Sequence, residues 1–245
     1  MPSNLALVDY YAKRANEYER IYTKPERQAD LAALKEVLCK TFAGHDVLEI
    51  ACGTGYWTQI ISQTAKSIVA TDINEEVLEI AKAKSYGCDV RFQRANALDL
   101  KNSRETFSAG FAAFWWSHLQ KSEIGNFLPS FHHQFTCGGL VVFMDNKFVA
   151  GSSTPINRSD SEGNTYQLRR LDDGSLHEIL KNFPSESECR AAVSDWATEI
   201  RWIELPFYWL LTYWLKVSDN RSCPNLASGA RLVSSRSAWR AEKPL

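Results

Sequence analysis

The sequence predicts an α/β fold: a doubly wound, mostly parallel seven-stranded sheet with an antiparallel final hairpin and an N-terminal helical lid. Short apolar runs alternate at least four times with helical segments between residues 47 and 145. Alternation with short connections is typical of a parallel sheet with helices on both faces. The runs are continuously apolar, as strands buried on both faces are. Two aromatic-rich runs at 200–204 and 207–215 predict the hairpin.

The expected elements follow in regular order. Strands are expected at 47–50, 67–71, 90–93, 107–115 and 140–145. Helices are expected at 56–63, 75–84 and 124–135. Ser185 with Glu188 three residues later forms a capping-box pattern, which predicts a further helix over 185–196.

Three segments lie outside this alternation. Residues 1–43 are expected to form a helical lid, since apolar and aromatic residues recur there at helical spacing. Residues 147–184 are too polar for a core and too long for a plain connection, which predicts an insertion that is functional or mobile. The domain is therefore expected to span 1–217, with 147–184 as a substrate cap. Residues 218–245 lack periodicity and are predicted to form a poorly ordered tail.

Composition excludes several classes of function. The chain has 245 residues, 44% of them hydrophobic, and a net charge of -1, so no global field attracts nucleic acid. No apolar run approaches the roughly 18 residues of a membrane span. The six cysteines lack C-x-x-C or other metal-ligand spacing. We expect a cytoplasmic monomer or homodimer that acts on a small molecule, with no metal, membrane or nucleic-acid partner.

The stretch VLEIACGTG marks the expected site. Gly53 and Gly55 directly follow the first strand. Glycines at the carboxyl end of a parallel strand let the backbone approach a ligand closely. Asp72 ends the second strand, about 20 residues later, where a carboxylate accepts hydrogen bonds from a ribose diol. The pattern predicts a nucleoside site.

The identity of the nucleoside follows from two departures from the dinucleotide fingerprint. The third glycine of G-x-G-x-x-G is replaced by Thr58. Glu49 lies four residues before Gly53, where a carboxylate would repel a pyrophosphate but would attract a sulfonium or an amino group. The pattern E-x-A-x-G-x-G therefore favours S-adenosylmethionine over NAD.

Five ordered stretches carry a family resemblance: VLEIACGTGYWT, VATD, RANALDL, AAFWWSHL and GGLVVFMDN. Over roughly 8–215 they resemble the motifs of the class I, Rossmann-like S-adenosylmethionine-dependent methyltransferases, especially the small-molecule group that includes the ubiquinone and menaquinone methyltransferases. The resemblance implies S-adenosylmethionine as cofactor and S-adenosylhomocysteine as product.

The resemblance also implies a set of cofactor-binding residues. Asn96 stands where the family often has an acid, and its side-chain oxygen can accept from the adenine amino group. If residues 1–43 form a lid over the cofactor, Arg14 would reach its methionine carboxylate. The alternative is that this segment contains only an ordinary amphipathic helix. The full expected set is Tyr11, Arg14, Tyr18, Glu49, Ala51, Gly53, Thr54, Gly55, Trp57, Asp72, Ile73, Asn96, Ala97 and Trp115.

The acceptor side is expected around the loop after the fourth strand. His118 is the candidate catalytic base, because a neutral imidazole accepts protons near neutral pH; a structural histidine is the alternative. Adjacent arginines in the insertion favour an anionic group on the acceptor. The expected substrate-side residues are Trp116, His118, Asn146, Tyr166, Arg169 and Arg170.

These inferences predict a methyltransferase that moves the sulfonium methyl of S-adenosylmethionine to an O, N or C nucleophile of a small molecule. Two alternatives stay open. One is a non-catalytic S-adenosylmethionine-binding protein. The other is an NAD(P)-dependent Rossmann oxidoreductase, against which the missing third glycine argues.

Overall fold

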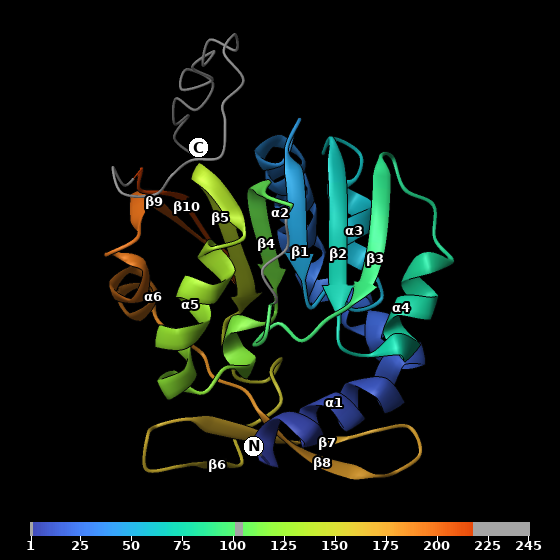
Figure 1. Ribbon diagram of the computed structural model, residues 1–245. Helices are drawn as coiled ribbons and strands as arrows, with labels where there is room; N and C mark the ends of the chain where they lie inside the picture. The colour runs from blue at the N-terminus through green and yellow to red at the C-terminus, as the bar shows by residue number, and fades with distance from the viewer. Residues whose placement is uncertain (1, 101–104, 218–245) are drawn as a thin grey trace, which may run out of the picture.

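The computed structural model describes residues 2–100 and 105–217, so the predicted tail at 218–245 lies outside the described residues. The strands of its large sheet are β1 (Asp46–Ile50), β2 (Ser67–Asp72), β3 (Asp89–Arg94), β4 (Phe107–Ala113), β5 (Phe135–Asn146), β9 (Ala197–Glu204) and β10 (Tyr208–Leu215). They stand in the order β3-β2-β1-β4-β5-β10-β9 (Figure 1). The first five pair in parallel, and β10 runs antiparallel to both its neighbours. The predicted fold class is confirmed.

Helices cover both faces of the sheet. They are α1 (Pro2–Arg14), α2 (Gln28–Thr41), α3 (Tyr56–Ile61), α4 (Glu75–Lys82), α5 (Ile124–His132) and α6 (Glu186–Val193), with the short 3-10 helices η1 (Ala15–Thr23), η2 (Pro25–Arg27), η3 (Trp116–His118) and η4 (Lys121–Glu123). None of the helices in the described ranges is long and apolar enough to cross a membrane. The capping box of Ser185 and Glu188 is present at the start of α6, as the sequence predicts.

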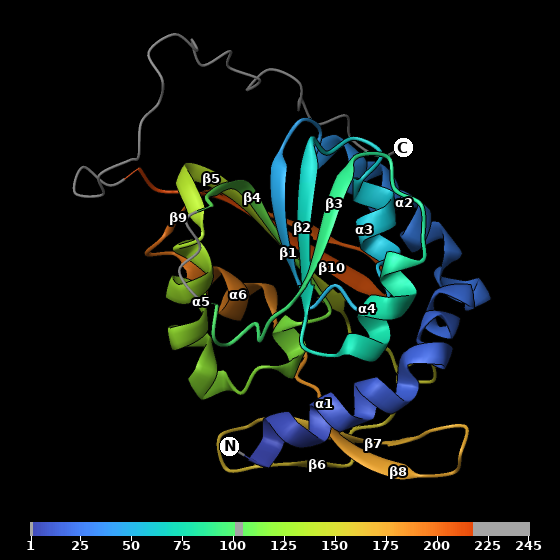
Figure 2. The same ribbon diagram turned by 45° about the vertical axis from the view of Figure 1, so that its right-hand side comes forward.

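Alternation along the strands builds two cores. Val47 packs with α2, α3 and α4 on one face, whereas Leu48 packs with α5 and α6 on the other. Figure 2 shows these two groups of helices on opposite sides of the sheet. Both side chains are at most 5% exposed, so the sheet is buried on both faces. This explains why its parallel strands read as continuous apolar runs in the sequence.

Several predicted boundaries differ from the structure, and three of them are informative. The first helix of the predicted lid ends at Arg14 and continues as the 3-10 helix η1. The predicted strand 107–115 ends at Ala113, because Phe114 turns to a positive φ of 57°. The predicted helix 124–135 ends at His132, and Phe135 already begins β5, where its ring packs over Gly110 of β4.

The insertion at 147–184 forms a small antiparallel sheet of β6 (Arg158–Ser159), β7 (Thr165–Arg170) and β8 (Leu176–Leu180), which we call the cap. Both views show the cap and α1 below the carboxyl ends of β1 to β3 (Figures 1 and 2). Leu7 and Tyr10 of α1 pack against Leu171 and Ile179 of the cap. The lid and the cap therefore lie together over the edge of the sheet where ligands bind in such folds.

Gly110→Ala tests how tightly β4 and β5 are packed. A Cβ at Gly110 would lie 2.2 Å from Cζ of Phe135, whose ring is buried. We expect this variant to lose about 1–3 kcal/mol of free energy of unfolding in urea titrations, because overpacking forces the core apart. Gly125→Ala is the control: no atom lies within 4 Å, and alanine in a helix gains up to about 1 kcal/mol. Equal stability of the two variants would contradict this packing.

Candidate active site

A strained turn follows β1. Ala51, Gly53 and Gly55 have φ angles of 50°, 56° and 74°. A Cβ at Gly55 would lie 2.6 Å from the Tyr86 hydroxyl oxygen and 3.0 Å from Cβ of Ala81, so only glycine fits there. The turn thereby brings the backbone at Gly53 close to the carboxyl end of β2.

The carboxylate of Asp72 ties this turn to β2. Its Oδ2 accepts a hydrogen bond of 2.9 Å from the Gly53 amide, and its Oδ1 accepts one of 2.9 Å from the Asn74 amide. Burial raises the pKa of Asp72, and these two amides oppose that shift. Each oxygen still has a lone pair, because a carboxylate accepts up to about four hydrogen bonds. Asp72 can therefore hold the turn and bind a diol at once.

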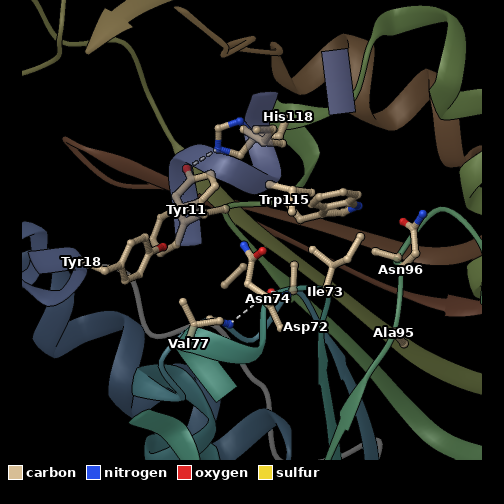
Figure 3. Close-up of a pocket in the computed structure, with 17 residues that line it drawn as sticks. Tyr11, Tyr18, Asp72, Ile73, Asn74, Val77, Ala95, Asn96, Trp115 and His118 are labelled. Carbon is tan, nitrogen blue, oxygen red and sulfur yellow. Dashed lines mark hydrogen bonds between the residues drawn. The ribbon is translucent and has the colours of Figure 1, made fainter. Parts of the chain in front are cut away.

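An apolar pocket opens beside Asp72 at the carboxyl edge of the sheet (Figure 3). Its walls come from α1, η1, the turn after β1, the start of α4, and the segments that follow β3 and β4. It is lined by Leu7, Val8, Tyr11, Tyr18, Ala51, Gly53, Asp72, Ile73, Asn74, Val77, Ala95, Asn96, Ala97, Ala113, Phe114, Trp115 and His118. Few polar groups in an otherwise apolar cleft are typical of a small-molecule site. Asn96 is held at its edge, because Oδ1 accepts from the Leu98 amide at 3.0 Å.

A second cavity, the polar chamber, adjoins the apolar pocket and has a volume of about 290 Å³. The two share Tyr11, Tyr18, Phe114 and His118. The lid, the cap and the loop after β5 form its walls, and the chamber is open to solvent on one side. Its lining includes six cationic side chains and the carboxylate of Glu17: the cations are Arg14, Lys24, Arg27, Arg169, Arg170 and Lys181.

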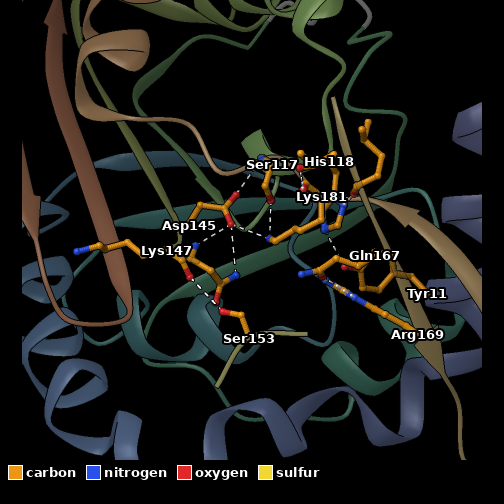
Figure 4. Close-up of polar contacts among 12 residues, drawn as sticks. Tyr11, Ser117, His118, Asp145, Lys147, Ser153, Gln167, Arg169 and Lys181 are labelled. Carbon is orange, nitrogen blue, oxygen red and sulfur yellow. Dashed lines mark hydrogen bonds and ion pairs between the residues drawn. The ribbon is translucent and has the colours of Figure 1, made fainter. Parts of the chain in front are cut away.

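His118 lies at the boundary between the two cavities. Its Nδ1 is 2.7 Å from the Leu180 carbonyl oxygen, which can only accept, so Nδ1 carries the proton of the neutral ring. Its Nε2 is 2.8 Å from the Tyr11 hydroxyl, which therefore donates to it (Figures 3 and 4). Burial lowers the pKa of His118 well below its usual value, and the nearby cations Lys181 and Arg169 lower it further. The imidazole is therefore neutral at neutral pH.

A buried ion pair fixes the wall behind His118. Nζ of Lys181 lies 2.8 Å from Oδ1 of Asp145, and the two side chains are 4% and 0% exposed. Oδ2 of Asp145 accepts from the Ser117 amide at 3.0 Å (Figure 4). Burial lowers the pKa of Lys181, while Asp145 opposes that shift. The pair joins the cap to β5 and η3.

The comparisons with known proteins agree with this site. Residues 47–139 match the family model of a methyltransferase domain. A probable S-adenosylmethionine-dependent methyltransferase of Mycolicibacterium smegmatis is 26% identical over 151 residues, 60% of this chain and 54% of the relative. A demethylmenaquinone methyltransferase of Clavibacter sepedonicus is 33% identical over 73 residues, 29% of this chain and 30% of the relative. The chain thus spans about half the length of the first relative.

Solved structures match over nearly their whole length. The structure of DhpI with SAH has a TM-score of 0.69 and 28% identity, covering 86% of this chain and 96% of DhpI. The DhpI–SAM–HEP complex has a TM-score of 0.72 and 26% identity, covering 86% and 97%. Residues 47–139 thus carry a methyltransferase domain, and 86% of the chain has the fold of structures solved with SAH and with SAM. S-adenosylmethionine is accordingly the cofactor of this domain.

The structure brings most of the expected cofactor residues of this methyltransferase domain together. The expected residues that line the apolar pocket are Tyr11, Tyr18, Ala51, Gly53, Asp72, Ile73, Asn96, Ala97 and Trp115. Arg14 lines the polar chamber instead. Thr54, Gly55 and Trp57 line neither cavity, and Trp57 Nε1 donates to the Tyr22 hydroxyl at 3.1 Å.

The expected substrate residues separate into two groups. Asn146, Arg169, Arg170 and His118 line the polar chamber, although the Arg170 side chain is largely exposed. Trp116 and Tyr166 line neither cavity. The Trp116 ring is buried in the core, 4.9 Å from the ring of Phe143. The Tyr166 hydroxyl donates to Asp160.

Sequence reasoning missed several lining residues of the methyltransferase site. In the apolar pocket they include Asn74, Val77 and Phe114, and in the polar chamber Arg27, Gln167 and Lys181. Asn74 could have been found, because it is two residues after Asp72 at the same strand end. No local pattern marks Lys181, whose partner Asp145 is 36 residues away.

Glu49 lies behind the pocket rather than on its wall. It is 1% exposed, and its Oε2 has no hydrogen-bond partner among the described residues. Burial raises its pKa from the usual 4.5 to about 8, and the nearby Asp72 adds to the shift. The carboxyl group is therefore largely protonated at neutral pH.

Glu49→Gln tests this protonation through the pH dependence of stability. Between pH 4.5 and about 8 the unfolded chain releases the proton and the folded chain keeps it. The free energy of unfolding then falls by up to about 1.4 kcal/mol per pH unit as pH rises, and the neutral glutamine removes that fall.

The measurement is urea unfolding of both proteins at pH 5, 6.5 and 8. We expect the stability of Glu49→Gln relative to the parent to increase steadily with pH. Glu76→Gln, on the exposed side of α4, is the control and should follow the parent curve. A Glu49→Gln curve parallel to that of the parent would show that Glu49 ionises normally.

Proposed function

We propose that the chain transfers the sulfonium methyl group of S-adenosylmethionine to an O, N or C nucleophile of a small molecule held in the polar chamber. The observation that supports this most directly is the shared wall of the two cavities. Tyr11, Tyr18, Phe114 and His118 face both of them. A methyl group presented at that wall would be within reach of a nucleophile in the chamber.

The residues of the apolar pocket fit the cofactor. Asp72 would accept hydrogen bonds from the ribose hydroxyls, since each of its oxygens keeps a lone pair. Asn96 would bind the adenine amino group, and Ala97 and Ile73 would pack against the ring. Arg14 would pair with the methionine carboxylate from the side of the polar chamber. Its guanidinium carbon lies 5.3 Å from the ring centre of Tyr18. The complexes of DhpI with SAH and with SAM support this use of the fold.

The protein residues would catalyse mainly by positioning and by excluding water. When bound, the cofactor supplies an electrophilic methyl carbon, and the carbon–sulfur bond breaks as the new bond forms. The lid and the cap, which pack against each other, would hold the two reactants in line and so lower the entropic cost of a bimolecular step.

His118 is the proposed base and would act through Tyr11. The Tyr11 hydroxyl already donates to Nε2 of His118, so it can take a proton from an O–H or N–H acceptor while passing its own to the imidazole. The low pKa of His118 keeps the ring neutral, so Nε2 has a lone pair to accept a proton, but it also makes the imidazole a weaker base. A nucleophile without an acidic proton would not need this path.

Calorimetric titration of the purified protein tests the cofactor and therefore the proposal. We expect micromolar binding of S-adenosylmethionine and S-adenosylhomocysteine and no binding of NADH. Asp72→Ala should weaken binding of both sulfur nucleosides by about 1–3 kcal/mol, because the ribose loses two hydrogen bonds.

Asp72 also holds the turn at Gly53, so thermal unfolding must show that the variant is folded. Asp72→Asn is the matched variant, which keeps one acceptor oxygen and should lose less affinity than Asp72→Ala. Unchanged affinity in a folded Asp72→Ala protein would contradict the ribose assignment. Absence of binding of either nucleoside to the parent protein would contradict the function.

A further inference from the structure

The polar chamber holds more positive charge than its own acidic groups balance. Within residues 2–100 and 105–217, the guanidinium groups of Arg14, Arg27 and Arg169 form no ion pair with a carboxylate. Lys181 is paired with Asp145 and therefore adds no net charge. Glu17, the one carboxylate on the chamber lining, accepts from the Asp172 amide.

The hydrogen-bond partners of these arginines are neutral. Arg27 donates to Oδ1 of Asn146 at 3.4 Å and to the Ser152 hydroxyl at 3.0 Å. It is 7% exposed, and its Nε has no partner among the described residues. Arg169 donates from Nε and Nη2 to the same Gln167 oxygen, at 3.2 and 2.7 Å (Figure 4).

Tyrosine rings cover the remaining faces. The Arg14 guanidinium lies 5.7 Å from the ring centre of Tyr10 and 5.3 Å from that of Tyr18. Arg169 lies 5.9 Å from the ring centre of Tyr10. Cation–π contacts of this kind stabilise a charge by about 1 kcal/mol, which is far less than the cost of withdrawing it from water. An anionic ligand would therefore stabilise the unpaired guanidiniums that line this cavity, above all the buried Arg27.

We propose that the methyl acceptor is a small molecule that carries an oxyanion, and that Arg169 and Arg27 bind this oxyanion in the polar chamber. The inference rests on the proposed function, in which Arg14 pairs with the cofactor carboxylate. Apart from the exposed Arg170, two guanidiniums then remain for the acceptor. Their forked donors match the oxygens of a phosphate, phosphonate or carboxylate.

The chamber limits the size of the acceptor. Its volume of about 290 Å³ is at the low end for small-molecule sites. Neutral donors and acceptors on its wall, including Gln167, Ser153 and Asn146, would bind further polar groups. With the oxyanion at Arg169, the nucleophilic end would face Tyr11, which lies on the wall shared with the apolar pocket.

The experiment is calorimetric titration of the protein saturated with S-adenosylhomocysteine, in Tris chloride buffer free of oxyanions. The anionic probes are inorganic phosphate, methylphosphonate and acetate; the neutral probes are dimethyl methylphosphonate and acetamide. We expect at least one anionic probe to bind about 10-fold or more tightly than its neutral counterpart. Comparing the affinities of phosphate and methylphosphonate with that of acetate shows which oxyanion the arginines prefer.

Variants locate the binding. Arg169→Gln should weaken binding of the preferred anion about 10-fold or more and leave affinity for S-adenosylhomocysteine unchanged, which also shows that the variant is folded. Arg158→Gln is the matched control, because it removes the same charge from the cap at a residue that lines neither cavity and pairs with Glu178. It should change anion affinity less than about 3-fold.

The outcomes separate the two proposals. Binding of S-adenosylhomocysteine together with equal affinity for anionic and neutral probes would overturn the oxyanion inference and leave the methyltransferase function standing. Equal losses in Arg169→Gln and Arg158→Gln would do the same, since net charge alone would then explain anion binding. A parent protein that fails to bind S-adenosylhomocysteine would overturn both.

Discussion

The buried ion pair between Lys181 and Asp145 is the contact on which the arrangement of the site depends. Removing one partner of such a pair typically costs about 3–5 kcal/mol, because the other charge stays buried without compensation. Lys181 directly follows β8 of the cap, and Asp145 lies near the carboxyl end of β5. The pair therefore anchors the C-terminal part of the 38-residue segment 147–184 to the sheet edge. Next to it, the Asn182 amide donates to the Ser117 carbonyl at 2.7 Å, which reinforces the junction.

The cap also supports the lid. Ile179 of β8 packs against Leu7 and Tyr10 of α1, so the cap provides part of the surface on which the lid lies. Leu180 then presents its carbonyl to His118, and Tyr11 reaches the other side of the same ring. Figure 4 shows this chain of contacts from Asp145 to Tyr11. The apolar pocket and the polar chamber are thus held in place by the same set of contacts.

The sequence predicted those features that depend on neighbouring residues. Strand periodicity gave the sheet, and Gly53 with Asp72 identified the nucleoside site, because each signal lies within one strand and the turn that follows it. The segment 147–184 was predicted as an insertion and a substrate cap, but its strands were not predicted, since β7 and β8 are short, polar and stabilised by each other. Lys181 and Arg27 were missed for the same reason: their partners are distant in the chain.

Two expectations show the limits of the resemblance. Glu49 matches a family motif, yet its side chain lies behind the turn, where it is protonated rather than anionic near neutral pH. Trp116 stands in the loop next to the expected methyl group, but the 3-10 helix η3 turns its ring into the core. In both cases the direction of the backbone at the end of a strand decides whether the side chain reaches a cavity. The spacing of residues in the sequence does not define this direction.

A crystal structure with S-adenosylhomocysteine bound would test the central claim, that transfer takes place at the wall between the two cavities. The account predicts ribose hydroxyls on Asp72, adenine beside Asn96 and the sulfur atom facing the polar chamber past Tyr11. A sulfur atom directed away from the chamber, or a nucleoside bound outside the apolar pocket, would contradict it.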